Sequence, residues 1–361
     1  MKQSLGRAAA AALAALCLSS GALAQAPGEQ QWREARAAAA ELAQQLARQC
    51  PLAPPDSQPA VEACRRGLYN DTVLRDKLAS FVLWGRQKDP KLTIRDSHLT
   101  QFAPDALTGM YLPLFMFNGE HEVVWVENEK LFQLRMRAAF RNRLQPGQFP
   151  YPFWHESEKW AMYQGAKEIV LWWDPKATKV KVAQFTVHST LDPLVAVAPV
   201  SAPVAFTGQW MWTDDRGRTQ PVSTVFDGLF RPENPYLREV EASYKALALR
   251  LREGQCDQCH VPSNPDKMKR LVLLQTPAHA AAEIERVLKS VRDDRMPRDE
   301  AGIEQPLDDK TKQALLKDGE AFAKLVEAAK RWEAQRMQSA APARQTSHTV
   351  TSGDRKTRDP A

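Results

Sequence analysis

Long apolar runs and a strong excess of one charge are both scarce in this 361-residue chain. Beyond the first 24 residues, no apolar stretch reaches the ~20 residues that a membrane-spanning helix needs. The best candidate, Leu194 to Phe206, is interrupted by Pro199 and Pro203. The formal net charge of +6 is too mild to indicate a nucleic-acid partner. We therefore expect no membrane span beyond the N-terminus and no nucleic-acid partner.

Motifs of the common enzyme classes are also scarce. The sequence shows no nucleophile triad, no phosphate-binding glycine loop and no pair of carboxylates at a catalytic spacing. The composition is otherwise ordinary for a globular protein, with 43% hydrophobic and 25% charged residues. A chain of this length is expected to form about two domains. Whether the chain is an enzyme stays open at this point, although a non-enzymatic role is favoured.

The N-terminus has the pattern of a secretory signal peptide. Lys2 and Arg7 precede an apolar run from Ala8 to Leu18, and small residues end this segment at Ala24. The pattern predicts a periplasmic protein cleaved near Ala24, with a net charge of 6 − 2 = +4 after the two cations are lost. Cys17 follows Leu16, where a lipoprotein signal needs a small residue, so no lipid anchor is expected.

Cysteine is scarce as well, because the chain has five and Cys17 lies in the predicted signal peptide. The other four form two pairs. Cys50 and Cys64 flank a proline-rich loop, and in an oxidising compartment they predict a structural disulfide. A reactive or metal-binding pair is the alternative, but the wide separation and the lack of a nearby histidine argue against it.

Composition and pattern divide the rest of the chain into four regions. Residues 25–66 form a helical segment with the predicted disulfide, its helix running from Gln30 to Gln49. Residues 67–230 hold eight of the ten tryptophans and predict an α+β domain. Residues 231–335 predict an all-α domain, and residues 336–361 a disordered polar tail. The fold class is thus multi-domain, an α+β middle domain followed by an all-α domain.

Within residues 67–230 the pattern predicts both strands and helices. Strand candidates are His121 to Val126, Glu168 to Trp173 and Val180 to His188, and the last two are predicted to form a hairpin. Helix-like intervals are Asn128 to Asn142 and Glu156 to Gly165.

The middle region carries few signs of chemistry. Four histidines could meet at a metal site, but none of their spacings is that of a metal motif, and isolated histidines are usually structural. Tryptophans and the Tyr151 to His155 stretch could line a pocket, but core is the safer interpretation. We assign this region to no family. The four histidines are His98, His121, His155 and His188.

The most informative string is Cys256-Asp257-Gln258-Cys259-His260. Cys-x-x-Cys-His is the attachment signature of c-type haem. Residues at i, i+3 and i+4 share one face of a helical turn, so Cys256, Cys259 and His260 can face one porphyrin. A thioredoxin-like redox pair and a zinc half-site are the rivals. The first needs a βαβ context and the second needs another ligand pair, and neither is evident.

Three amphipathic helices are predicted around this motif. The first carries Leu237, Val240, Tyr244, Leu247 and Leu251 at spacings of three and four. The second opens at Thr276-Pro277 and ends near Met296-Pro297. For the third helix, Asp308 or Asp309 is the predicted N-cap residue. Its apolar face includes Gly319, which would let another helix approach closely. The other members of that face are Leu315, Phe322, Val326, Ala329 and Trp332.

With this order of helices, residues 231–335 resemble a class I c-type cytochrome domain, which would cover under a third of the chain. The resemblance implies one covalent haem c per chain, held by Cys256 and Cys259, with His260 as the first axial ligand. In that family a methionine, frequently followed by proline, supplies the second axial ligand, and Met296-Pro297 matches. Met268 and His279 are the competitors. The single motif disfavours a di-haem peroxidase, which needs two.

Two functions follow from this resemblance. The first is a periplasmic electron carrier whose middle domain docks a redox partner protein. The second is a haem-containing oxidoreductase or sensor whose middle domain binds a substrate or ligand. Basic residues after the motif could steer an acidic partner, although acidic residues are interspersed with them. The basic residues are Lys267, Lys269, Arg270, Arg292, Arg295 and Arg298.

Overall fold

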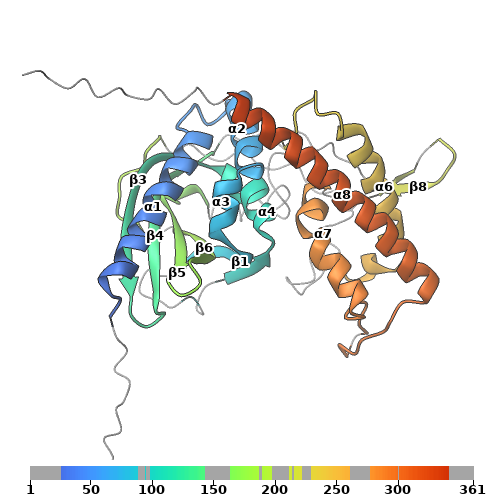
Figure 1. Cartoon of the computed structure of the whole chain (residues 1–361). Coiled ribbons are helices and arrows are strands. Elements are labelled where there is room, and N and C mark those ends of the chain that lie inside the picture. The colour runs from blue at the N-terminus through green and yellow to red at the C-terminus, as the bar shows by residue number, and fades with distance from the viewer. Residues whose placement is uncertain are drawn as a thin grey trace, which may run out of the picture.

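The protein is described from a computed structural model. The structure describes residues 26–87, 94, 98–142, 163–186, 189–196, 211–213, 215–221, 229–260, 277–299 and 301–340. The predicted signal peptide and nearly all of the predicted polar tail lie outside these ranges. A sheet with covering helices precedes a group of three long helices, so the chain contains both α and β structure (Figure 1).

A six-stranded mixed sheet forms the first part, in the order β2-β1-β6-β5-β4-β3. Strand β1 pairs parallel with β6, and the other neighbours pair antiparallel. The predicted hairpin is present, because β5 and β6 pair through a turn after Asp174. The strands are β1 (Leu78–Gln87), β2 (His98–Phe102), β3 (Phe115–Val126), β4 (Leu131–Phe140), β5 (Glu168–Asp174) and β6 (Lys179–Thr186).

Helix α1 (Glu29–Gln49) lies across one face of this sheet, over β3 and β4 (Figure 1). Its alanine-rich stripe allows close packing, and Leu42 and Leu46 are fully buried. A disulfide joins Cys50, at the end of α1, to Cys64 in α2 (Gln58–Tyr69). The helix α3 (Thr72–Lys77) then leads into β1. The disulfide therefore fixes the two helices that begin the sheet unit.

Aromatic residues fill the core beneath the sheet. Trp84 donates a hydrogen bond from Nε1 to the Tyr163 hydroxyl at 3.0 Å. Tyr163 stacks on Phe185 with ring centroids 3.9 Å apart. Trp172 and Trp173 are also buried. Most of the middle-region tryptophans whose side chains the structure describes are thus core residues. This agrees with the interpretation that the sequence favoured. Tyr151 to His155 lies outside the described residues.

The prediction of a helix over Asn128 to Asn142 is wrong, because this segment contains strand β4. Helix-forming residues such as Leu134 and Met136 suggested the helix. The alternation of Phe132, Leu134, Met136, Ala138 and Phe140 instead places every second side chain in the core, with a period of two. Lys130 has a φ of 55° and closes the turn from β3 into β4. Tertiary pairing with β3 and β5 outweighed local propensity here.

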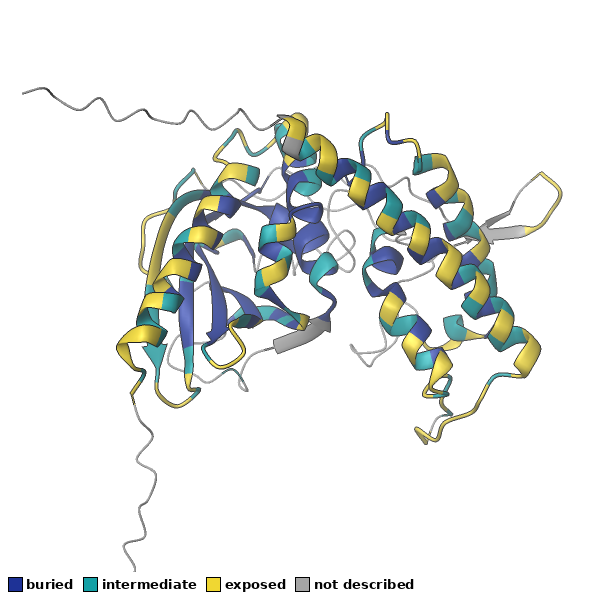
Figure 2. Ribbon diagram, in the orientation of Figure 1, coloured by how far each residue is buried: buried dark blue, intermediate teal, exposed yellow. Residues whose placement is uncertain are grey.

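Three long helices follow, α6 (Leu237–Glu253), α7 (Pro277–Arg292) and α8 (Asp309–Ala340). Their buried faces meet in one apolar core that includes Tyr244, Ile284 and Phe322 (Figure 2). A β-carbon added at Gly319 of α8 would lie 2.7 Å from Leu288 of α7, which confirms that this glycine permits a close helix approach. A small hairpin, β7 (Met211–Thr213) and β8 (Thr219–Pro221), precedes them.

Polar residues connect the helices to the sheet unit. Lys330 of α8 pairs with Asp105 of the short helix α4 (Pro104–Ala106). Glu283 of α7 accepts a hydrogen bond from the Ala103 backbone N–H at 2.7 Å. Asn70 donates its amide to the Leu229 carbonyl at 2.9 Å. Among the helices that the structure describes, none is long and apolar enough to span a membrane.

Candidate functional site

The Cys-x-x-Cys-His motif follows directly after α6, and the local backbone explains its shape. Helix α6 ends at Glu253, and Gln255 adopts a left-handed φ of 58° that turns the chain away from the helix axis. A short 3-10 turn then covers Cys256–Gln258. The His260 backbone N–H donates to the Cys256 carbonyl at 2.9 Å. The two cysteines and the histidine are thereby held within a single turn.

The two cysteines of the motif differ in their surroundings. Cys256 is half-buried and packs against the apolar core of the three helices, whereas Cys259 is exposed. They are not joined by a disulfide, although the chain forms one between Cys50 and Cys64. Burial, followed by the nearby Asp257 carboxylate, raises the pKa of the Cys256 thiol to about 11. Cys256 is therefore a protonated thiol at neutral pH.

A protonated, core-facing thiol is the opposite of what a redox-active pair requires. Reactive Cys-x-x-Cys pairs have a lowered thiol pKa and an electropositive setting. A zinc site requires further ligands, and the described residues contain no group of three or more histidine, cysteine or acidic side chains that could hold a metal ion. The two thiols and one imidazole fit haem c, which is held by two thioether bonds and one axial histidine.

Met296 lies in the loop between α7 and α8, with 39% of its surface exposed. The loop is held by its own contacts, since the Gln305 N–H donates to the Pro297 carbonyl at 2.9 Å. Arg298 and Glu304 form an ion pair at 3.1 Å across it. An ordered loop thus presents an exposed thioether. Met268 lies outside the described residues.

His279 lies in the first turn of α7 and is buried against Phe102 of β2, with ring centroids 5.9 Å apart. Neither of its ring nitrogens has a hydrogen-bond partner. Burial, reinforced by the charge of Arg286, lowers the pKa of His279 to about 4, so the imidazole is neutral near pH 7. The structure places His279 at the boundary with the sheet unit.

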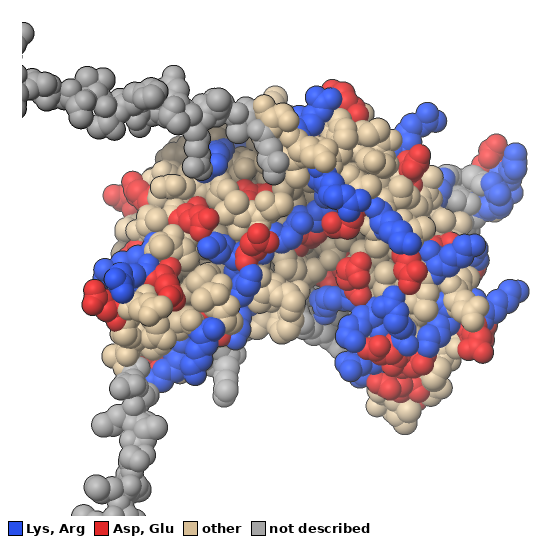
Figure 3. Space-filling view, viewed as in Figure 1, with Lys and Arg blue, Asp and Glu red and all other residues tan. Residues whose placement is uncertain are grey.

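Several described basic residues that follow the motif form ion pairs with acidic side chains. Arg292 pairs with Glu320 at 3.1 Å, and Arg298 pairs with Glu304. Lys289 and Lys312 pair with the two aspartates that follow α7, Asp293 and Asp294, each at 2.6 Å. Figure 3 shows basic and acidic side chains interspersed over this part of the surface. The described basic residues therefore do not form a patch of one sign, and Lys267, Lys269 and Arg270 lie outside the described ranges.

The histidines of the middle region do not gather into a site where they are described. His121 lies in the exposed middle part of β3 and contacts the Gly119 carbonyl through Nδ1 at 3.1 Å. His98 begins β2 and pairs with Arg86 in the sheet register. His155 and His188 lie outside the described residues.

Comparison with known proteins gives no relative. No protein-family model matches the chain, and no curated protein or solved structure matches it.

Sequence reasoning missed the buried polar residues between the three long helices and the sheet unit, and those near the disulfide. Lys330, Glu283 and Arg141 are almost fully buried. The only available signal was a charged residue within an otherwise apolar face, as at Lys330 between Val326 and Trp332 on α8. Such a signal does not reveal which residue on another segment is the partner.

Proposed function

We propose that the chain is a periplasmic mono-haem c-type cytochrome that acts in electron transfer. Residues 231–335 would form a class I cytochrome c domain with one covalent haem c on Cys256 and Cys259. The observation that carries the proposal is that Cys256, Cys259 and His260 stand on a single backbone turn directly after an amphipathic helix.

The chain's own residues have three roles in this proposal. The two thiols would hold the haem covalently, and the half-buried Cys256 would attach it beside the apolar core of the three helices. His260 and Met296 would hold its iron, which would leave no position open for dioxygen or peroxide. When bound, haem c supplies a one-electron ferric and ferrous couple.

Met296 is preferred as the second ligand over His279. Its thioether is exposed on an ordered loop, while His279 packs against Phe102 and contributes to the boundary with the sheet unit. Methionine ligation favours the ferrous form and a higher reduction potential than two histidines.

The middle region is proposed to dock a redox partner protein. Most of its aromatic residues with described side chains are packed in the sheet core, which supports a structural role for them, whereas Phe81 is exposed. An oxidoreductase or sensor whose middle region binds a substrate or ligand is the second candidate. A cavity beside strand β4 is the observation that favours that candidate.

Covalent haem content tests the proposal directly. The full chain is exported to a periplasm that has haem-attachment machinery, and haem per polypeptide is measured after denaturing electrophoresis. One haem per chain is expected, and a Cys256→Ala/Cys259→Ala variant should have none. Cys50→Ala/Cys64→Ala is the matched control, because it also removes two cysteines but should keep the haem. A wild-type chain without retained haem would refute the proposal.

Carbon monoxide distinguishes the two functions. An electron carrier with both axial positions filled by side chains should bind carbon monoxide poorly when reduced. A rapid spectral change on adding the gas would favour the oxidoreductase or sensor.

A further inference from the structure

The two sulfurs of the Cys50–Cys64 disulfide have different surroundings, although both cysteines are 0% exposed. Cys50 ends α1 and is followed by a loop at the surface, in which Leu52 is 41% exposed. Cys64 lies within α2, and its Sγ is 3.8 Å from the carbonyl oxygen of Pro113. The Cys50 side of the bond is therefore the side nearer to solvent.

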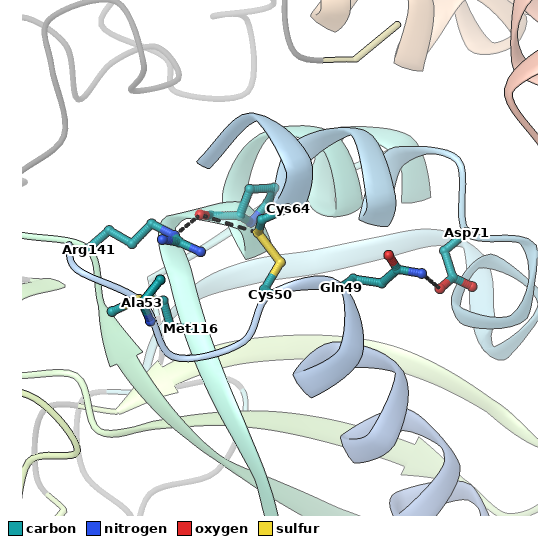
Figure 4. The surroundings of a disulfide bond; sticks show 8 residues. Gln49, Cys50, Ala53, Cys64, Asp71, Met116 and Arg141 are labelled. Atoms are coloured by element: carbon teal, nitrogen blue, oxygen red, sulfur yellow. Dashed lines mark hydrogen bonds between the residues drawn. A yellow bond between two sulfur atoms is a disulfide. The ribbon is translucent and has the colours of Figure 1, made fainter. Parts of the chain in front are cut away.

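The loop after Cys50 is held by few contacts. Its residues 51–57 are exposed or half-buried. The Cys50 carbonyl accepts from the Phe117 N–H at 2.8 Å, and the Ala53 N–H donates to Met116 Sδ at 3.4 Å (Figure 4). A thioether is a weak acceptor. Local opening of this loop would uncover the Cys50 sulfur and leave α2 in place.

Arg141 lies beside the other sulfur. Its Nε donates at 3.1 Å to the same Pro113 carbonyl that lies next to Cys64 Sγ. Figure 4 shows both contacts meeting at one oxygen beside the disulfide. The Arg141 side chain is 0% exposed, and its backbone N–H donates to the Leu114 carbonyl at 2.8 Å. The guanidinium is thus fixed inside the protein next to Cys64.

The guanidinium of Arg141 lacks a counter-charge. Nη1 and Nη2 are buried and have no hydrogen-bond partner among the described residues. Burial lowers the pKa of Arg141 to about 10, with no contribution from a carboxylate, so the group remains a cation at pH 7. The carboxylate of Asp71, labelled in Figure 4, accepts instead from Gln49 at 3.2 Å and from the Leu74 N–H at 2.9 Å.

Reduction of the disulfide would create the missing anion. A buried cation is strongly unfavourable unless an anion neutralises it, and a Cys64 thiolate would be formed beside Arg141. Reactive cysteines are found in electropositive surroundings, because the cation stabilises the thiolate. A better stabilised thiolate is also a better leaving group in thiol–disulfide exchange. The sequence showed no cation near this pair, because Arg141 is brought there only by the fold.

We propose that the Cys50–Cys64 disulfide is an exchangeable redox site, at which a dithiol reductant attacks Cys50 and Arg141 stabilises the departing Cys64 thiolate. The reductant thiolate, having lost its proton to solvent, bonds to Cys50 Sγ, and the electron pair of the broken S–S bond leaves on Cys64 Sγ. The second thiol of the reductant then displaces Cys50, which takes up that thiol's proton. The protein gains two electrons and the dithiol becomes a disulfide. The proposal is independent of haem attachment.

The redox equilibrium of the full chain tests this proposal. The protein is equilibrated at pH 8 with mixtures of reduced and oxidised dithiothreitol, quenched with acid, unfolded and alkylated. Mass spectrometry of the peptides that contain Cys50 and Cys64 reads this pair separately from Cys256 and Cys259. The pair should become reduced while circular dichroism shows that the chain is still folded. A disulfide that dithiothreitol reduces only after urea has unfolded the chain overturns the proposal.

Variants of Arg141 test its role. Arg141→Met should need a roughly tenfold higher ratio of reduced to oxidised dithiothreitol for half-reduction, the effect of one pKa unit in the released thiol. Arg141→Lys keeps the charge and should stay near the wild-type midpoint. Arg135→Met is the matched control, because Arg135 lies on β4 but donates to Gln133, and it should leave the midpoint unchanged. An unshifted midpoint in Arg141→Met overturns the proposal.

The choice of sulfur is tested without any change at Arg141, which covers the case in which Arg141→Met does not fold. Wild-type chain is exposed briefly to glutathione, a monothiol, and is then quenched with acid and mapped by peptide mass spectrometry. The mixed disulfide should be on Cys50, because Cys64 is the leaving group. Glutathione found on Cys64, or equally on both cysteines, would overturn the proposal as well.

Discussion

Lys330 of α8 forms an ion pair with Asp105 of α4, and it does so across the boundary between the helices and the sheet unit. The lysine side chain is only 5% exposed, and its ammonium also lies 4.8 Å from the centre of the Tyr69 ring. Arg75 approaches the other oxygen of Asp105 at 3.0 Å. Burial lowers the pKa of Lys330, and the Asp105 charge opposes that effect. An ion pair thus holds the C-terminal half of α8 to the sheet unit.

Removal of one member of this pair should destabilise the protein. Lys330→Met leaves Asp105 with Arg75 alone, so we expect a loss of about 3 kcal/mol, the low end for breaking a buried ion pair. Urea unfolding measures it, and a double variant with Asp105→Asn should lose less than the sum of the single variants. Lys289→Met is the control, because its solvent-exposed pair with Asp293 should contribute little to stability. Equal losses of stability in Lys330→Met and Lys289→Met would contradict this expectation.

Met296→Ala tests the second axial ligand. The haem should stay covalently attached, but the ferric absorption band of methionine ligation should disappear and the reduction potential should fall. Visible spectroscopy and redox titration measure these changes. His279→Leu and Met268→Ala should keep the band. An unchanged spectrum in Met296→Ala would exclude this methionine as the ligand.

His279 should make the folded state sensitive to acid. Its folded pKa of about 4 lies below the ordinary value of 6.5, so the unfolded chain binds more protons between these two values. The contribution is present in full above pH 6.5 and is lost as the pH falls toward 4. The lost stability is about 3 kcal/mol over that window. Urea unfolding at a series of pH values measures it.

The pH series needs a variant that cannot titrate at this position. His279→Leu should show a shallower loss of stability between pH 6.5 and 4, while carboxylates elsewhere titrate as before. If the wild type and His279→Leu show the same slope, His279 is not the neutral, buried imidazole described above.

The disulfide between Cys50 and Cys64 should stabilise the first two helices against unfolding. The bridge closes a loop over a sequence separation of 14, and cross-linking a loop of that size contributes about 3 kcal/mol in the chain-entropy model. Cys50→Ala/Cys64→Ala should lower the free energy of unfolding by that order. Unchanged stability of the reduced wild type relative to the oxidised form would contradict the expectation.

Sequence patterns predicted the helices well because their apolar faces repeat at helical spacing. Val240, Tyr244 and Leu247 are buried on α6 as expected, and Gly319 meets Leu288 as its position suggested. The candidate site could be found because Cys256, Cys259 and His260 fall within five residues of one another in the sequence. These features depend on local spacing alone.

Relationships between distant segments could not be predicted in the same way. The sequence predicts a helix where β4 lies because its residues favour both structures, and only pairing with β3 and β5 decides between them. The partners of Lys330 and the buried state of Arg141 depend on residues far away in the sequence. A single sequence provides no measure of such proximity.

The length of α8 has a consequence for the order of assembly. Lys330 and Glu333 are among the last described residues, yet they contact Asp105, Arg231 and Asn234 far earlier in the chain. A chain that emerges from its N-terminus would therefore complete its sheet before this final helix forms. Until then Cys256 to His260 would follow a helix, α6, that lacks its main packing partner α8.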